Sequence, residues 1–359
     1  MYRCRRCGRS YERDRTAPWR CNCGHALDFA ESARPSTDAP ETVDRDRGLW
    51  AFEGFLPVEG SVTLGEGWTP LVAAPDWEAT FKLDWLFPTG SFKDRGAAVT
   101  LSLAADLGVD RVLEDSSGNA GAAIATYAAR AGIDAEIFVP ADANPGKLRA
   151  IENAGADVVR VEGTRQAVTE ACHEAVEADR GWYASHAWNP AFFAGTATVA
   201  YEIAAQSDWT APDAMIVPTG HGTLLLGAYR GFEALREAGW IDRIPRLYAA
   251  QAAGTAPLVA ARHGDAAAAG ANDRADGIQI RQPARHDQLL AAIDDSAGDA
   301  VAIDETETTV QLDRLHRDGL QVEPTCAVAP AALERLREQG EIGADEDVVV
   351  VLTGSGLKA

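Results

Sequence analysis

Lysine is nearly absent from this sequence of 359 residues. Of its 33 basic residues only four are lysine, and the other 29 are arginine. Acidic residues number 54, which gives a formal net charge of −21. An acidic surface with arginine in place of lysine is typical of adaptation to high salt, where screening weakens self-repulsion; solubility alone is the simpler explanation. Either way, this charge argues against general binding of nucleic acid or of anionic membranes.

A lysine that persists in such a sequence is a candidate for chemistry that arginine cannot perform. Lys93 lies in the stretch PTGSFKDRG, residues 88–96, behind a glycine–serine–aromatic turn. Arginine keeps its proton in proteins and therefore cannot act as an amine nucleophile. We expect Lys93 to have such a role, and we expect Lys82 and Lys147 at the surface.

Long apolar runs are absent as well. The sequence has no run of about 18 apolar residues, so it predicts no membrane-spanning helix. The amino-terminal stretch MYRCRRCGRS lacks the apolar core of a signal peptide. We therefore expect a cytoplasmic protein without a membrane partner.

The six cysteines are not spaced like the disulfide framework of a secreted protein. Four of them form a C-x2-C pair and a C-x-C pair separated by thirteen residues: Cys4, Cys7, Cys21 and Cys23. Two thiolate pairs supply four tetrahedral zinc ligands and leave no open position for catalysis. The sequence thus predicts structural zinc, with spare reduced thiols or a lost metal as the alternatives. Cys172 and Cys326 are interpreted as buried, inert thiols.

The chain divides into three predicted parts. Residues 1–30, with seven arginines against three acidic residues, are interpreted as a zinc ribbon, and residues 31–60 as a linker and lead-in. In residues 61–359, short apolar strands alternate with amphipathic helices, which predicts an α/β fold. We expect two doubly wound, parallel-sheet subdomains, the smaller at about 95–200 and inserted in the larger.

Three loops share one design, in which small polar residues stand between a strand end and a helix start. They are DSSGNAG at 115–121, PTGHGTLLLG at 218–227 and LTGSG at 352–356. The carboxyl ends of parallel strands line the ligand crevice, so we expect these loops to converge. The second predicts a phosphate site, because its glycines expose N–H groups at a helix start. It is neither a P-loop nor a full dinucleotide fingerprint, whose third glycine is here Leu225.

An amine, a phosphate cradle and an asparagine-bearing turn are what a pyridoxal phosphate enzyme needs. In this order, TGSFKDRG, DSSGNAG, GHGTLLLG and LTGSGLK resemble the motifs of the fold-type II pyridoxal phosphate enzymes. The resemblance covers essentially the whole chain and is closest to the threonine synthase branch, which often carries an amino-terminal cysteine ribbon. A homodimer is the family expectation.

The resemblance also implies roles for individual residues. Lys93 would be the catalytic lysine that forms a Schiff base with the cofactor, Asn119 would bind the ring oxygen, and Thr353 would face the ring nitrogen. The cofactor phosphate would bind to backbone N–H groups of Gly220, His221, Gly222, Thr223 and Leu224. The substrate carboxylate would bind to Ser116, Ser117 and Gly118. The implied lyase reaction of amino-acid biosynthesis converts O-phospho-L-homoserine and water to L-threonine and phosphate.

One stretch departs from the pattern of this branch. NPAFFAGTAT, residues 189–198, stands where threonine synthases commonly show NPYRIEGQKT. Phe192 and Ala197 replace an arginine and a lysine that a phosphorylated substrate would use. Asn189 is the substrate-binding residue that we predict from this stretch, with Ser185 and Thr196 as further polar candidates. Arg149 or Arg165 is a candidate to supply the missing charge.

Two other functions stay open. A β-eliminating or β-replacing enzyme on the same scaffold would act on a smaller amino acid, as a threonine or serine dehydratase or a cysteine or cysteate synthase does. A non-catalytic regulator would use the ribbon to bind nucleic acid or a protein and the α/β body to sense a metabolite, but the retention of Lys93 argues against it.

Overall fold

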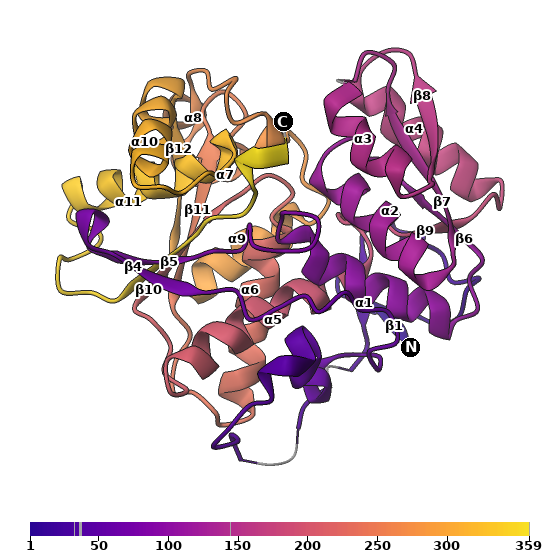
Figure 1. Ribbon diagram of the computed structural model, residues 1–359, viewed down its shortest axis with the longest axis horizontal. Coiled ribbons are helices and arrows are strands. Elements are labelled where there is room, and N and C mark those ends of the chain that lie inside the picture. Colours follow the sequence, from indigo (N-terminus) through magenta and orange to yellow (C-terminus); the bar gives the residue numbers. More distant parts are fainter. Residues whose placement is uncertain (32, 36–37, 144, 359) are drawn as a thin grey trace.

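The computed structural model describes residues 1–31, 33–35, 38–143 and 145–358. These residues form a three-stranded, a four-stranded and a six-stranded sheet. In Figure 1 the four-stranded sheet and its helices stand beside the six-stranded sheet, and helices α1, α5 and α6 lie between them. The described residues also form 3-10 helices: η1 Arg45–Phe55, η2 Pro75–Trp77, η3 Asp276–Ile278, η4 Pro324–Ala327 and η5 Gly356–Lys358.

The six-stranded sheet has the order β12-β11-β10-β13-β5-β4. Its strands are β4 Leu71–Ala74, β5 Ala79–Lys82, β10 Ala214–Pro218, β11 Arg246–Ala252, β12 Asp299–Ile303 and β13 Val348–Val351. All neighbours are parallel except β4, which pairs antiparallel with β5 at the edge. The expectation of purely parallel sheets therefore needs correction at this edge. The connection between β4 and β5 is too short for the crossover that a parallel pair requires.

Helices cover both faces of this sheet because alternate strand residues point to opposite sides. Met215 and Val217 of β10 join the core formed with α5 and α6, whereas Ala214 and Ile216 join the core formed with α10 and α11. The helices around this sheet are α5 Pro190–Gln206, α6 Thr223–Glu237, α7 Pro257–His263, α8 Asp265–Ala268, α9 His286–Asp295, α10 Glu305–Arg317 and α11 Val328–Glu338.

The four-stranded sheet is entirely parallel and has the order β8-β7-β6-β9. Its strands are β6 Arg111–Glu114, β7 Asp134–Pro140, β8 Asp157–Val161 and β9 Trp182–Tyr183, and the neighbouring helices are α1 Lys93–Asp106, α2 Asn119–Ala131, α3 Pro145–Asn153 and α4 Arg165–Glu177. Val112 packs with α1, α2 and α3 on one face, and Leu113 packs with α4 on the other. The sheet lies inside the predicted insert of about residues 95–200, whose boundaries stay a prediction.

Helix α5 joins the two halves, since it packs closely on both α1 and α6. A Cβ atom on Gly195 would lie 2.0 Å from the backbone oxygen of Arg95, and one on Gly227 would lie 2.1 Å from Thr196 Oγ1. Only glycine permits these approaches. Nearly every residue of α5 is buried, so the helix has no polar face.

A cluster of buried charges fixes α1, the helix that begins with Lys93. The Arg95 guanidinium donates to both Asp84 oxygens at 2.9 and 2.8 Å and to both Glu202 oxygens at 2.6 and 2.8 Å. Lys82 Nζ donates to Glu202 Oε2 at 2.8 Å, and all four side chains are fully buried. The expectation that Lys82 lies at the surface is therefore wrong, because this lysine is paired inside the core. The side chain of Lys147 lies outside what the structure describes.

The amino-terminal unit is a small antiparallel sheet of β1 Tyr2–Cys4, β2 Ser10–Tyr11 and β3 Leu27–Phe29. Its Asp28 is buried and accepts from Arg5, Arg230 and Arg285 at 2.7–2.9 Å. Burial would raise the pKa of Asp28, but these three guanidinium groups hold it well below its ordinary value. The unit is thus docked on the large body by an ion cluster in which the unit supplies the carboxylate and the body supplies two of the three guanidinium groups.

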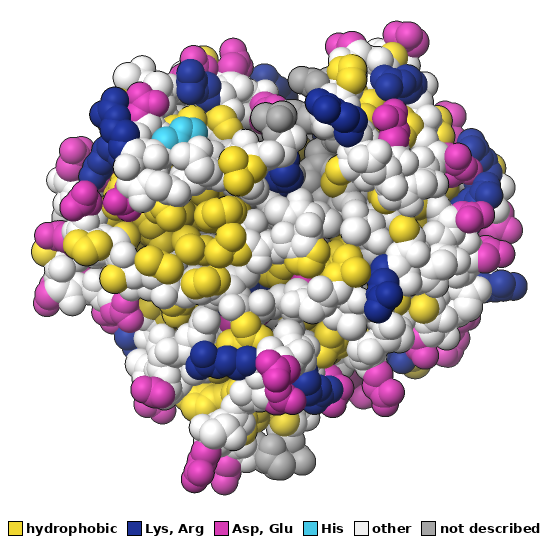
Figure 2. Space-filling model, viewed as in Figure 1, with side chains coloured by type: hydrophobic (Ala, Val, Ile, Leu, Met, Phe, Trp, Pro, Cys, Tyr) yellow, Lys and Arg dark blue, Asp and Glu magenta, His cyan; other side chains and the backbone are white. Residues whose placement is uncertain are grey.

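Charged side chains of both signs are mixed over the surface. Figure 2 shows Asp and Glu side chains around the rim of one face, with Lys and Arg side chains between them. No helix among the described residues has the length and apolar character needed to cross a membrane.

The buried cluster predicts a large loss of stability when one charge is removed. Burial raises the pKa of Glu202, but Arg95 and Lys82 outweigh it and lower this pKa to about 2. Glu202→Gln leaves two buried cations undercompensated, and we expect it to lower the free energy of unfolding by about 3–5 kcal/mol. Urea unfolding at pH 7 and constant salt measures this loss.

The same interaction has a defined pH dependence. Because the pKa is lowered in the folded state, the carboxylate stabilises the fold fully above its unfolded value of 4.5 and loses this effect as pH falls toward 2. The difference in the free energy of unfolding between wild type and Glu202→Gln should therefore become smaller below pH 4.5. Glu338→Gln, an exposed change on α11, is the control; equal effects of the two variants at pH 7 contradict the prediction.

Candidate active site

A cavity of about 250 Å³ lies at the carboxyl ends of β6, β10 and β13. It brings together residues from all three predicted loops and the predicted lysine: Lys93, Ser116, Ser117, Gly118, Asn119, Gly220, His221, Gly222, Thr223, Leu224 and Thr353. The convergence of the loops follows from the parallel strands that precede them, since such strands end at one edge of their sheet. Their roles toward a ligand stay a prediction at this point.

Lys93 is the first residue of α1 and lies between two aromatic rings. Its Nζ donates to Thr223 Oγ1 at 3.3 Å and lies 4.6 and 5.8 Å from the ring centres of Phe92 and Phe192. Burial lowers the pKa of Lys93 to about 8, against the opposing pull of two carboxylates. Roughly one amine in ten is then neutral at pH 7, where an ordinary lysine has fewer than about one in a thousand.

The glycine loop between β10 and α6 has the features of an anion site. Gly222, the N-cap of α6, has a φ of 71°, and no side chain caps the helix. A Cβ at Gly222 would lie 2.3 Å from the Leu289 side chain, so the loop excludes larger residues. The uncapped N–H groups at the start of α6 are therefore available to a phosphate.

The loop between β6 and α2 presents Asn119 at the other side of the cavity. Asn119 Nδ2 donates to both carboxylate oxygens of Glu323 at 3.1 Å, and its Oδ1 accepts from Lys358 Nζ at 2.7 Å. The amide is thus oriented by two neighbours that the sequence analysis did not single out. Glu323 lies outside any recognisable motif, and no sequence signal identifies it.

Thr353 follows β13 and lies beside a buried thiol. Its hydroxyl lies 3.6 Å from the Cys326 thiol, and its backbone oxygen accepts from Phe92 N at 3.0 Å. Burial raises the pKa of Cys326 to about 12, so the thiol carries no charge. A ring nitrogen placed here would meet the Thr353 hydroxyl, in a cavity that the Glu323 carboxylate also lines.

Two histidines and a buried glutamate form a further part of the site. His186 lines the cavity, and its Nδ1 lies 2.6 Å from Glu114 Oε1, a fully buried carboxyl at the end of β6. The His221 ring packs edge-on against His186 at 5.1 Å, and its buried Nδ1 has no hydrogen-bond partner among the described residues. Burial lowers the pKa of His186 well below its ordinary value and that of His221 to about 3, so both rings are neutral. Glu114 ends the mostly apolar strand RVLE, and a glutamate at such a position is a sequence feature that could have indicated a buried carboxyl group with a partner.

Asn189 does not line this cavity. Its Oδ1 accepts from Ala191 N at 3.0 Å, and its Nδ2 donates to the Tyr183 oxygen at 3.3 Å, so the side chain caps α5. Ser185 and Thr196 are likewise buried and bond to neighbouring backbone. The substrate-binding role predicted for Asn189 needs correction, because capping a buried helix uses its amide.

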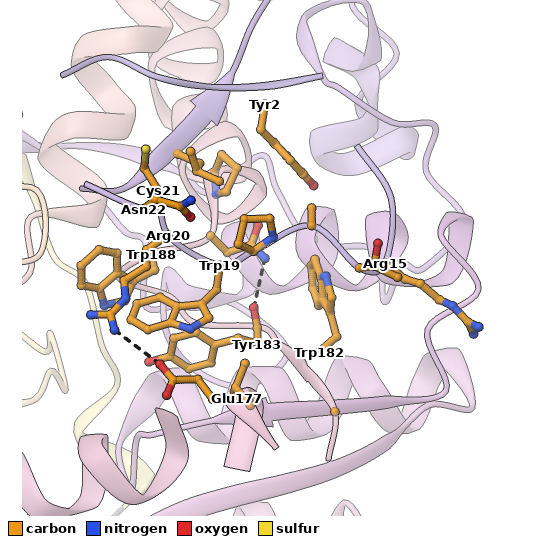
Figure 3. Close-up of a pocket in the computed structure, with 18 of the residues that line it drawn as sticks. Tyr2, Arg15, Trp19, Arg20, Cys21, Asn22, Glu177, Trp182, Tyr183 and Trp188 are labelled. Carbon is orange, nitrogen blue, oxygen red and sulfur yellow. Dashed lines mark hydrogen bonds and ion pairs between the residues drawn. The ribbon is translucent and has the colours of Figure 1, made fainter. Parts of the chain in front are cut away.

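A larger cavity of about 920 Å³ lies between the amino-terminal unit and the four-stranded sheet (Figure 3). Trp19 stacks on His173 at 4.2 Å and meets Tyr183 edge-on, and the Tyr183 hydroxyl donates to Asp115 at 2.7 Å. Lys93 and the glycine loop do not line this cavity. The smaller cavity is therefore the candidate active site.

The four amino-terminal cysteines gather as the spacing predicts. Their sulfur atoms all lie within 4.8 Å of one another, with Cys4–Cys23 at 3.5 Å and Cys7–Cys21 at 3.4 Å. Four sulfurs bound to one zinc ion at about 2.3 Å would be separated by about 3.8 Å. The donor set and its spacing therefore fit a closed tetrahedral metal site.

Comparisons with known proteins agree with this geometry. A family model described as pyridoxal-phosphate dependent enzyme matches residues 62–354. The chain is 32% identical to the threonine synthase of Methanocaldococcus jannaschii over 100% of this chain and 93% of the relative, and 32% identical to that of Methanosarcina acetivorans over 99% and 91%. It is similar in fold to the processed form of threonine deaminase isoform 2 from Solanum lycopersicum, with a TM-score of 0.71, 19% identity and 92% of each chain covered.

The lowered pKa of Lys93 predicts how the protein without cofactor captures pyridoxal phosphate. Because burial lowers this pKa to about 8, the reactive neutral amine should increase about tenfold per pH unit below pH 8 and level off above it. Stopped-flow absorbance at constant salt measures the capture rate. A rate that keeps rising to pH 10 would contradict the prediction. Lys93→Ala, which should carry no covalent cofactor after borohydride reduction, is the control.

Proposed function

The chain belongs to the pyridoxal-phosphate dependent enzymes, and we propose that it is a threonine synthase, which converts O-phospho-L-homoserine and water to L-threonine and phosphate. One observation carries this proposal: the likeness to threonine synthases extends over the whole chain. It includes the amino-terminal cysteine unit, which lies outside the part matched by the general family model.

The residues around the cavity fit the cofactor of this family. The loop from Gly220 to Leu224 offers uncapped N–H groups for its phosphate. Asn119 lines the same cavity, and its amide would exchange its bond with Glu323 for one with the ring oxygen. Lys93 offers an amine that is largely desolvated and titrates near pH 8. When bound, pyridoxal phosphate supplies an electron sink for chemistry at the substrate Cα.

Each residue then has a defined task. Lys93 would hold the cofactor through its amine, and the same amine would be the base for the proton on the substrate Cα; a pKa near the working pH suits an amine for this transfer. Ser116, Ser117 and Gly118 bind the substrate carboxylate and thereby orient the Cα–H bond toward Lys93. Thr353 would face the ring nitrogen with a hydroxyl, a partner that suits elimination and replacement better than transamination.

The second candidate is a β-eliminating enzyme on the same scaffold. Phe192 and Ala197, which stand where a phosphorylated substrate would need cations, are both buried and apolar. Phe192 packs against Gly96 of α1 below Lys93, and Ala197 lies in the core between α5 and α6. Neither residue lines the cavity, so their apolar character by itself decides neither the size nor the charge of the substrate.

A substrate panel distinguishes the two candidates. For a threonine synthase we expect purified enzyme to release phosphate and form L-threonine from O-phospho-L-homoserine, with little 2-oxo acid from threonine or serine. Phosphate release and 2-oxo acid formation are measured in parallel, in both low and high salt. If 2-oxo acid is formed and phosphate is not released, the protein is a dehydratase, and the proposal fails.

The amino-terminal cysteines are proposed to hold one structural zinc ion. We expect purified protein to contain about one zinc per chain, because four thiolates satisfy its tetrahedral preference. Cys4→Ser and Cys23→Ser should each lower the zinc content measured by atomic emission. Cys172→Ala, which removes a buried thiol outside the cluster, should retain it. Full zinc content in both Ser variants contradicts the assignment.

The homodimer and the adaptation to high salt stay predictions. Strand β4 is an edge of the six-stranded sheet, and its Val72 is exposed. Figure 2 shows hydrophobic side chains gathered on this side of the molecule. Such an edge offers a surface for a second copy.

A further inference from the structure

A phosphorylated amino acid would bring a third anion into the cavity. The start of α6 is proposed for the cofactor phosphate, and the loop from Ser116 to Gly118 for the substrate carboxylate. The phosphate on the substrate side chain needs a group of its own, preferably an arginine that binds it through two parallel hydrogen bonds. The stretch 189–198 does not supply that group, since its two candidate positions are apolar and buried.

Arg165 is placed to supply it. It is the first residue of α4, on the four-stranded-sheet side of the cavity, and it lines the cavity together with His186 and His221. Lys93 and Arg165 are the lysine and arginine residues among the described lining residues, and Lys93 is committed to the cofactor. Arg165 therefore provides the permanent positive charge of the cavity.

The Arg165 side chain is exposed and makes no hydrogen bond or ion pair with the described parts of the chain. Many other arginines are paired. The guanidinium groups of Arg95 and Arg285, for example, form ion pairs with buried carboxylates. An unpaired guanidinium can turn toward an incoming anion without first breaking an ion pair. After burial, the positive charge of Arg165 is a smaller cause that lowers the pKa of Lys93, His186 and His221, which line the same cavity.

The two neutral histidines beside Arg165 add directional groups without adding charge. The buried Nδ1 of His221 has no partner among the described residues. His186 is held by Glu114, which fixes the direction of its ring. A phosphate beside Arg165 would thus meet one cation in a cavity that two neutral imidazole rings also line.

We propose that Arg165 binds the phosphate of the substrate side chain and so selects a phosphorylated amino acid over a neutral one. The inference rests on the proposed function. It assigns to Arg165 the phosphate contact for which threonine synthases commonly have cations at the positions that are Phe192 and Ala197 here. Arg149, the other candidate from the sequence, is exposed on α3 and does not line the cavity.

The test compares Arg165→Gln with Arg165→Lys and with the matched control Arg149→Gln. A hydrogen-bonded charge pair is worth about 1.5–3 kcal/mol, so Arg165→Gln should lower kcat/KM for O-phospho-L-homoserine about 10- to 150-fold. The inhibition constant of inorganic phosphate should rise with it. Arg165→Lys should fall between wild type and Arg165→Gln, because lysine keeps the charge but loses the planar fork. Arg149→Gln should match wild type.

A binding measurement separates a phosphate contact from general damage to the site. L-threonine has a neutral side chain, and its affinity, read from the visible spectrum of the bound cofactor, should change less than about threefold in Arg165→Gln. Equal losses for L-threonine and for the phosphorylated substrate would overturn the inference. An active wild type with an unchanged Arg165→Gln would overturn it as well. A wild type that releases no phosphate would instead refute the proposed function, and the inference with it.

Discussion

The buried pairing of Arg95 with Asp84 and Glu202 is the constraint on which the active site depends. Arg95 follows Lys93 by two residues in the first turn of α1, so the cluster sets the position of the reactive amine. It connects α1 with the segment after β5 and with α5, and it connects the two halves of the protein through them. Two buried cations and two buried carboxylates compensate one another, and this balance makes complete burial tolerable.

Burial also decides the chemistry of the cavity. Desolvation lowers the pKa of Lys93, which raises the share of neutral amine, and it keeps the imidazoles of His186 and His221 neutral. The exposed Arg165 keeps its charge at the same cavity. In the proposed function, the desolvated amine of Lys93 takes part in the reaction, and the unpaired guanidinium of Arg165 recognises the substrate.

Features that depend on local sequence could be predicted, and features that depend on packing could not. The alternation of strands and helices, the three loops and the four cysteines are local patterns, and the structure brings the loops together and gathers the cysteines. Helix α5 was not recognised, since a helix buried on all sides has no amphipathic period. Lys82 was misplaced because a charge alone suggests solvent, and Asn189 because a motif position does not show where the amide points.

The sequence by itself determined the type of chemistry. A scarce lysine behind a glycine–serine turn and a glycine loop at a helix start are short-range features whose function follows from the residues themselves. Only the tertiary structure decided which charges meet. Glu323 reaches Asn119 across 204 residues, and of the two arginines that the sequence offered for the missing charge only Arg165 lines the cavity. Such pairings form where elements that are distant in the sequence cross in space. Hydrophobic periodicity specifies which face of an element is buried, but it does not specify which residue of another element lies opposite that face.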